Sequence, residues 1–107
     1  MKEPYKGKQT GGASTPPGVL TQVQSVVIYT KSTCPYCHAA KALLKRKGAS
    51  FEEISVDGDR PGQMAMARKA GGRSTVPQIF IGETHVGGCD DLHDLEAAGK
   101  LDKLLTD

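Results

Sequence analysis

The stretch of sequence that decides the fold is VVIYTKSTCPYC, residues 26–37. It opens with a β-branched and aromatic run, Val26–Tyr29, which is typical of a buried central strand. Pro35 suits the first turn of a helix, where its missing N–H is not needed. Apolar residues then recur at helical spacing until a glycine stop at residue 48, so we expect a helix from Pro35 to about Lys47. A strand therefore leads directly into a helix at the first cysteine of this stretch.

The rest of the chain predicts further strands and helices. They are a strand at 51–56, a helix at about 62–70, two hairpin strands at 78–81 and 84–86, and a closing helical segment at 90–105 divided by Gly99. A strand–helix–strand unit implies parallel strands with a right-handed crossover, and a hairpin adds an antiparallel pair. The sequence therefore predicts an α/β fold with a mixed four-stranded sheet and helices on both faces, an arrangement that resembles the thioredoxin-like fold.

The composition fits one folded domain preceded by a polar tail. The chain has 107 residues, of which 37% are apolar, and this length suits a single domain. Residues 1–24 are rich in glycine, proline, lysine, glutamine and threonine and offer little to bury. We expect a flexible tail there, either native or an artificial extension, and a folded domain over residues 25–107.

Charge, hydropathy and cysteine content exclude several classes of protein. The formal net charge is only +2, with basic and acidic residues interspersed, so we expect no nucleic-acid partner. No run approaches the roughly 20 apolar residues that cross a bilayer, and the N-terminus lacks the apolar centre of a secretory signal. Three cysteines are too few for the disulfide framework of a small secreted domain. We expect a cytoplasmic protein without a membrane partner.

Cys34 and Cys37 lie at the junction of strand and helix and carry the expected chemistry. Unpaired backbone N–H groups and the dipole at a helix N-terminus favour a thiolate over a thiol. Lys31 lies three residues earlier and adds a positive charge. We therefore assign Cys34 as the nucleophile that attacks an external disulfide. Cys37, nearly one turn further along, would displace the mixed disulfide and leave an internal bridge.

The alternative for a Cys-x-x-Cys pair is half of a zinc site. The sequence has no second such pair, Cys89 is remote, and the histidines His38, His85 and His93 lack the spacing of metal ligands. A cysteine pair that follows a strand and opens a helix is instead typical of a redox site. We therefore predict a redox site and no metal site.

The segment Thr75-Val76-Pro77 precedes the third strand. Proline restricts the preceding residue to extended backbone, so Val76 is suited to pair with the main chain of a peptide-like substrate, as an added strand does. An ordinary proline at the start of a strand is the alternative. Either interpretation places extended backbone immediately before the strand.

The segment Gly87–Asp91 follows the fourth strand and opens the last helix, with Asp90 or Asp91 as the N-cap. Glycines allow a ligand to approach the backbone, and a helix start binds a carboxylate. A nearby aspartate would accept a hydrogen bond from an amine, so an amino-acid-like group would be matched at both ends. A glycine turn with a routine cap is the alternative. We interpret Cys89 as a small packed residue rather than a third catalyst.

Four segments together resemble the dithiol glutaredoxins, particularly the bacterial type. They are Tyr29-Thr30-Lys31, Cys34-Pro35-Tyr36-Cys37, Thr75–Gly82 and Gly87–Leu92, and the resemblance covers about residues 25–105. The resemblance implies a thioredoxin-like fold with a cis proline beside the active-site cysteines. It also implies a monomer without a permanently bound cofactor, with glutathione as co-substrate and reductant. Disulfide-containing or glutathionylated proteins would be its substrates.

The resemblance also implies a glutathione site. By position, Lys31 would meet the glycine carboxylate with Tyr36 beside it, and Val76 would pair with the cysteinyl backbone. Cys89 and Asp90 would hold the γ-glutamyl end. The implied glutathione-binding residues are Lys31, Tyr36, Gln63, Thr75, Val76, Pro77, Cys89 and Asp90.

Two alternatives stay open within this resemblance. Gln63 is the contact from the second helix only if the glycine pair at 71–72 contains a one-residue insertion; otherwise Met64 occupies that position. The rival function is an iron-sulfur cluster carrier, in which Cys34 and glutathione ligate a cluster shared between two subunits. Monothiol relatives with that role usually carry Cys-Gly-Phe-Ser, from which Tyr36 and Cys37 depart.

Overall fold

The computed structural model describes residues 22–106, which form a single mixed sheet flanked by helices. In chain order the elements are β1 (Val26–Thr30), α1 (Pro35–Arg46), β2 (Glu52–Ser55), α2 (Arg60–Lys69), β3 (Gln78–Ile81), β4 (Thr84–Gly87), α3 (Cys89–Ala97) and α4 (Leu101–Thr106). The strand order is β2-β1-β3-β4. β1 pairs parallel with β2 and antiparallel with β3, and β3 pairs antiparallel with β4. The predicted order and the mixed four-stranded sheet are confirmed.

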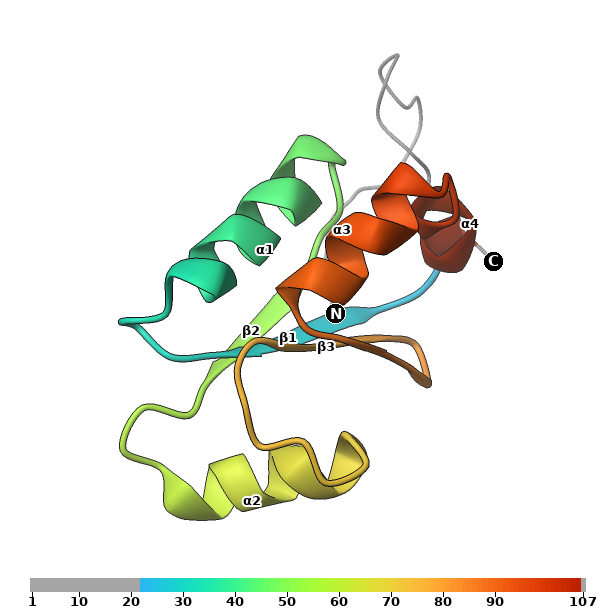
Figure 1. The fold of residues 1–107 in the computed structure, drawn as a ribbon. Helices are drawn as coiled ribbons and strands as arrows, with labels where there is room; N and C mark the ends of the chain where they lie inside the picture. Colours follow the sequence, from blue (N-terminus) through green and yellow to red (C-terminus); the bar gives the residue numbers. More distant parts are fainter. Residues whose placement is uncertain (1–21, 107) are drawn as a thin grey trace.

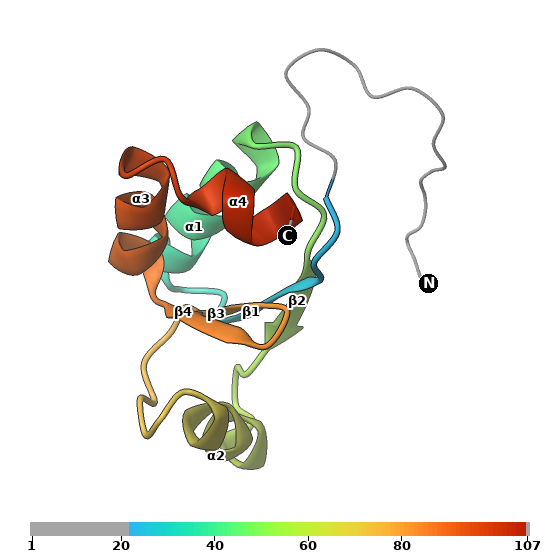
Figure 2. The same ribbon diagram turned by 90° about the vertical axis from the view of Figure 1, so that its right-hand side faces the viewer.

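Helices cover both faces of the sheet, as predicted (Figures 1 and 2). Helices α1, α3 and α4 lie on one face, and α2 lies alone on the other. The larger core, which includes the fully buried Leu44 and Leu92, fills the first face. A smaller cluster, which includes Tyr29 and Met66, lies toward α2. β1 serves both cores because successive strand residues such as Ile28 and Tyr29 point to opposite faces.

Helix α2 begins earlier than predicted. The sequence suggested a turn over residues 59–62 because proline and glycine are common in turns. In the structure Asp59 is the N-cap, and its Oδ1 accepts a hydrogen bond of 2.9 Å from the N–H of Gly62. Pro61 therefore occupies the first turn of the helix, where proline is tolerated.

Residues 22–24 are attached to the folded domain. The N–H groups of Val23 and Gln24 both donate to the carbonyl of Leu105, at 2.9 and 3.0 Å. The folded domain therefore extends at least to residue 22. The remainder of the predicted tail, residues 1–21, lies outside the described residues.

The small core under α2 gives a matched pair of stability measurements. Met66 is fully buried, whereas Met64 on the same helix is 52% exposed. We expect Met66→Ala to lower the free energy of unfolding by about 2–5 kcal/mol, through lost burial and a cavity. Met64→Ala, the same chemical change, should shift it by less than about 0.5 kcal/mol. Urea unfolding followed by circular dichroism measures both; equal losses would contradict the assignment of Met66 to the core.

Candidate active site

Cys34 is the N-cap of α1, where strand β1 delivers the chain to the helix. Its half-buried Sγ accepts a hydrogen bond of 3.2 Å from the N–H of Cys37. On its other side, Sγ lies 3.7 Å from the carbonyl oxygen of Val76. A backbone N–H at a helix start stabilises an anionic acceptor. The Cys34 sulfur therefore lies between a backbone donor in the first turn of α1 and the backbone acceptor of Val76.

The loop that leads to Cys34 is fixed by an aspartate that the sequence analysis did not single out. Both carboxylate oxygens of Asp57 lie within hydrogen-bond distance of the N–H of Ser32, at 3.1 and 2.9 Å. This backbone hydrogen bond is the main reason why the pKa of Asp57 is lowered. Asp57 lies just beyond β2, so its contact joins the end of β2 to the loop before α1. Asp57 reaches this loop because β2 pairs parallel with β1, so both strands end at the same edge of the sheet.

Cys37 differs sharply from Cys34 in its surroundings. It is fully buried, and burial together with the hydrogen bond to Cys34 raises the pKa of the Cys37 thiol to about 12. Cys37 is therefore protonated at neutral pH, while the Cys34 sulfur is accessible and capped by a donor. The two thiols of the pair are asymmetric, as the position in the helix predicts.

The segment before β3 lies against the Cys34 sulfur. The Val76–Pro77 peptide bond is cis, which confirms the geometry that the family resemblance implied. Because β3 runs antiparallel to β1, with Gln78 opposite Tyr29, the start of β3 lies beside the end of β1. The sheet thus brings Val76 and Cys34 together across 42 positions of sequence.

The start of α3 differs from the predicted cap. Gly88, rather than Asp90 or Asp91, is the N-cap. The Asp91 carboxylate reaches back and accepts a hydrogen bond of 2.9 Å from the N–H of Gly88. Gly87 has φ +115°, and a Cβ there would collide with the Asp91 carboxylate. Gly87 therefore makes room for the carboxylate that fixes the turn.

These segments meet at a small pocket of about 160 Å³, whose lining includes Val76, the residue that contacts the Cys34 sulfur. Six of the predicted glutathione-binding residues line it: Tyr36, Thr75, Val76, Pro77, Cys89 and Asp90. The structure thus brings together the start of α1, the segment before β3 and the start of α3. The pocket combines an exposed aromatic ring, extended backbone and a helix N-terminus, which is suited to a small peptide-like group.

Two predicted residues do not line this pocket. Lys31 lies in the loop before Cys34, and its carbonyl accepts a hydrogen bond from the Cys34 N–H at 3.2 Å. Gln63 donates from Nε2 to the carbonyl of Ser74 at 2.8 Å, so its amide binds the loop that leads to Thr75. The alternative residue, Met64, is largely exposed on α2.

Arg73 lines the pocket although the sequence analysis did not single it out. Its Nη1 lies 3.3 Å from Oδ2 of Asp91, and this ion pair joins the loop after α2 to the start of α3. The contact, together with the stronger hydrogen bond from Gly88, lowers the pKa of Asp91. An isolated arginine after two glycines forms no sequence pattern that predicts a pocket residue. The ion pair with Asp91 in the folded protein places Arg73 at the pocket.

Cys89 is buried at the edge of the pocket, as predicted for a packed residue. Burial, and then the negative charge of Asp90, raises the pKa of its thiol. Its Sγ lies 3.4 Å from Nδ1 of His93, which also contacts the Cys89 carbonyl at 2.9 Å. A buried, protonated thiol is a poor nucleophile, which argues against Cys89 as a third catalyst.

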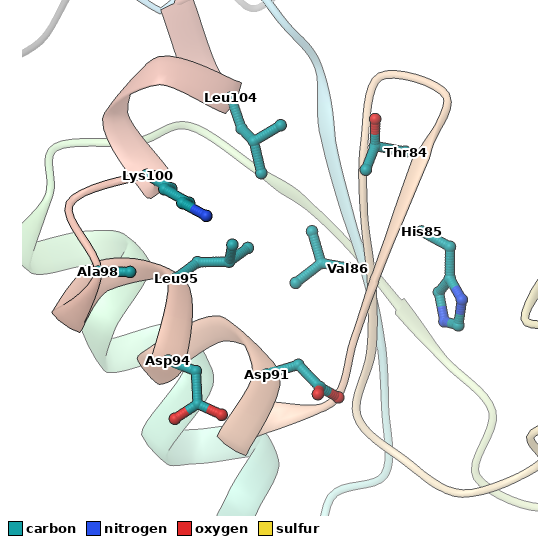
Figure 3. Close-up of a pocket in the computed structure, with 9 residues that line it drawn as sticks. All are labelled: Thr84, His85, Val86, Asp91, Asp94, Leu95, Ala98, Lys100 and Leu104. Carbon is teal, nitrogen blue, oxygen red and sulfur yellow. The ribbon is translucent and has the colours of Figure 1, made fainter.

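A larger groove of about 360 Å³ lies between β4 and the two C-terminal helices (Figure 3). Val86, Leu95 and Leu104 point into it, with Asp94 and Lys100 at its rim. No cysteine lines this groove. Among residues 22–106, no group of three or more histidine, cysteine or acidic side chains is placed to hold a metal ion. The smaller pocket, in contrast, is lined by Val76, whose carbonyl oxygen lies 3.7 Å from the Cys34 sulfur.

A thioredoxin-like sheet with an asymmetric dithiol at the start of its first helix defines a thiol oxidoreductase. The glutaredoxin family model matches residues 26–86. A glutaredoxin of Pseudomonas aeruginosa is 65% identical over 81 residues, covering 76% of this chain and 95% of the relative. Glutaredoxin 3 of Escherichia coli is 58% identical, covering 76% of this chain and 96% of the relative. The chain belongs to the glutaredoxin family.

Solved structures agree with this assignment. The solution structure of a Brucella melitensis glutaredoxin matches with a TM-score of 0.69 and 51% identity, over 86% of this chain and 95% of that one. The crystal structure of a buckwheat glutaredoxin–glutathione complex matches with a TM-score of 0.70 and 35% identity, over 77% of this chain and 76% of that one. The thioredoxin-like fold is therefore shared with relatives of known structure.

The asymmetry of the thiols predicts selective alkylation. At neutral pH, iodoacetamide should modify Cys34 more than about tenfold faster than Cys37 or Cys89, because the latter two thiols are buried and their pKa values are raised. Mass spectrometry of peptides from the briefly treated, reduced protein measures the three rates. In urea all three should react at similar rates, which provides the control. Equally fast labelling of Cys37 in the folded protein would contradict the asymmetry.

The Asp91 contacts predict a pH-dependent contribution to stability. The folded-state pKa of Asp91 is lowered, so its carboxylate stabilises the fold above the unfolded value near 4 and loses this effect as pH falls through the folded value. We expect Asp91→Asn to cost at most about 1 kcal/mol at neutral pH, because the side chain is 45% exposed and screened. Urea unfolding should show this difference vanishing in acid. Asp94→Asn, an exposed carboxylate on the same helix, should give no such pH-dependent difference.

Proposed function

We propose that the protein is a glutathione-dependent thiol–disulfide oxidoreductase that reduces protein disulfides and protein–glutathione mixed disulfides. The observation that carries this proposal is the asymmetric pair: an accessible Cys34 sulfur that accepts a backbone N–H, and a buried Cys37 thiol with a pKa of about 12. The Cys34 sulfur is suited to attack a disulfide. The Cys37 thiol is suited to stay protonated until it displaces the mixed disulfide.

With a glutathionylated protein, Cys34 acts alone. Its thiolate attacks the glutathione sulfur, the protein thiolate leaves, and a Cys34–glutathione disulfide forms. The thiolate of a second glutathione then attacks the glutathione sulfur of that disulfide. Oxidised glutathione leaves, and the Cys34 thiolate is restored. One free glutathione is consumed in this route, because the other half of the oxidised glutathione is the glutathionyl group taken from the protein.

With a protein disulfide, both cysteines take part. Cys34 attacks one sulfur and forms a mixed disulfide with the substrate, whose second sulfur leaves as a thiolate. Cys37 then transfers its proton to a thiolate of the substrate and attacks the Cys34 sulfur. The reduced substrate leaves, and a Cys34–Cys37 disulfide remains, which two molecules of glutathione reduce. The hydrogen bond between the Cys37 N–H and the Cys34 sulfur supports the short separation that this step needs.

The pocket beside Cys34 is the proposed glutathione site. Val76 would pair with the cysteinyl backbone, and Asp90 at the start of α3 would hold the γ-glutamyl end. Tyr36, which is 63% exposed, would cover the tripeptide, and Lys31 would meet its glycine carboxylate. The glutathione complex of the similar buckwheat protein supports glutathione as the ligand.

Thr75, Pro77 and Cys89 complete the proposed lining of the site. Gln63 binds the Ser74 carbonyl, so we assign it to the shape of the loop rather than to the ligand. We propose that the protein works as a monomer in a cytoplasm, where reduced glutathione is available. Among residues 22–106, no helix is both long and apolar enough to cross a membrane.

Serine variants of the two active-site cysteines separate the two routes. Cys34→Ser should lower activity on a glutathionylated peptide by more than about a hundredfold, because it removes the nucleophile. Cys37→Ser should retain most of this activity and lose reduction of a protein disulfide, because glutathione replaces Cys37 only in the first route. A coupled assay with glutathione, glutathione reductase and NADPH measures both. Near-normal turnover of Cys34→Ser would refute the proposal, and a coloured, cluster-bearing dimer after anaerobic purification would favour the cluster carrier.

A further inference from the structure

A buried hydrogen-bonded chain connects β4 to the segment beside Cys34. Gln78 on β3 is fully buried although it is polar. Its Nε2 lies 3.0 Å from the carbonyl oxygen of Thr75 and 3.3 Å from Oγ1 of the same residue. Its Oε1 lies 2.7 Å from Nε2 of His85 on β4. Both ends of the buried amide are therefore engaged, as burial of a polar group requires.

The direction of each hydrogen bond in this chain follows from chemistry. The Thr75 carbonyl can only accept, so Gln78 must present its NH₂ group there. The Gln78 oxygen then faces His85 and can only accept, so Nε2 of His85 must carry a proton. The network therefore fixes both the Gln78 amide orientation and the His85 tautomer. If the amide were flipped, Oε1 of Gln78 would face the carbonyl oxygen of Thr75, and neither atom could donate a hydrogen bond.

Aromatic packing fixes the orientation of the His85 ring. It stacks on Phe80 with a centroid distance of 4.9 Å and an interplanar angle of 28°. Phe80 in turn makes an edge contact with Tyr29 at 5.8 Å. The side chains of His85 and Val86 extend from β4 in opposite directions (Figure 3). The imidazole thus has a fixed plane, and its Nε2 is directed at Gln78.

The other end of the chain reaches the active site. Thr75 immediately precedes Val76, whose carbonyl lies 3.7 Å from the Cys34 sulfur. The Gln78 amide spans the turn from Thr75 to β3 and so fixes the backbone on either side of Val76. A shift of this backbone would move the edge with which a peptide-like substrate pairs, without changing the first turn of α1.

We infer that His85 is a positioning residue for the substrate-binding segment Thr75–Pro77 and acts through the Gln78 amide. This inference rests on the proposed function, in which the Val76 backbone orients the glutathionyl group for attack by Cys34. His85 does not touch the reacting sulfur atoms. Its Nε2–H donates to Gln78 Oε1, and Gln78 donates to Thr75. Loss of the His85 donor leaves a buried acceptor unpaired and frees the amide to turn.

Two variants separate hydrogen bonding from shape. His85→Phe keeps an aromatic ring against Phe80 and removes the donor. His85→Gln loses the ring and retains an amide N–H donor at a similar distance along the side chain. We expect His85→Phe to lower kcat/KM for a glutathionylated peptide about five- to tenfold, the effect of one buried hydrogen bond. His85→Gln should stay within about twofold of the wild-type value.

Alkylation of Cys34 by iodoacetamide provides a readout that general damage would move. This small reagent needs no pairing with Val76, so its rate with His85→Phe should stay within about twofold of the wild-type rate. Thermal unfolding of each variant shows whether it is folded at the assay temperature. In the wild-type protein, ¹⁵N NMR of the imidazole should show the proton of neutral His85 on Nε2.

The outcomes separate this inference from the proposed function. Inactive wild-type protein with the glutathionylated peptide would refute the proposed function. An active wild-type protein with an unimpaired His85→Phe variant would overturn the positioning role. Equal losses in His85→Phe and His85→Gln would show that the shape of the ring, rather than its N–H donor, matters. A neutral His85 with its proton on Nδ1 could not donate from Nε2 to Gln78, which would also overturn the positioning role. The positioning role is supported only if His85→Phe alone is impaired while Cys34 alkylation is unchanged.

Discussion

The hydrogen bond from the Cys37 N–H to the Cys34 sulfur organises the site. It exists because Cys34 is the N-cap of α1, so the sulfur occupies the position that a capping side chain fills in other helices. Pro35 at the first helical position fixes the direction of the helix without competing for the sulfur. The same turn places the second thiol one turn deeper, where it is buried. One local geometry thus gives the two sulfur atoms different surroundings, one accessible and one buried, and this difference supports the roles that we propose for them.

The sheet assembles the rest of the site around that sulfur. β1 ends at Thr30, shortly before Cys34. β3 begins beside the end of β1 because the two strands are antiparallel, and β4 returns to the same end because it is antiparallel to β3. Gly87 at the end of β4 lies opposite Ile79, near the start of β3. Three loops from distant parts of the sequence therefore meet at one end of the sheet. The strand directions alone bring these loops together, and their side chains then line the pocket.

Local patterns predicted the elements and the position of the cysteine pair at the start of a helix, because strand runs, helix stops and the Cys-x-x-Cys spacing are local properties. The start of α2 was mistaken because Pro61 and Gly62 suit a turn as well as a first helical turn. The cap of α3 was mistaken because Asp91 caps from the third helical position rather than from the N-cap.

Contacts between segments could not be predicted from the sequence. Arg73 gains its place from the ion pair with Asp91, and Asp57 gains its place from the loop before Cys34. Gln78 and His85 look like ordinary strand residues until pairing of β3 with β4 sets one against the other.

The third cysteine shows how the fold confines the chemistry to one sulfur. Cys89 lies at the pocket edge, near enough to Cys34 for the two charges to interact. A second thiolate there would compete for the same disulfide substrates. Burial and the adjacent Asp90 both raise the pKa of Cys89, although it opens a helix just as the residues after Cys34 do. A helix start is therefore insufficient to activate a thiol: the sulfur must also be accessible, and Cys34 alone among the three meets both conditions.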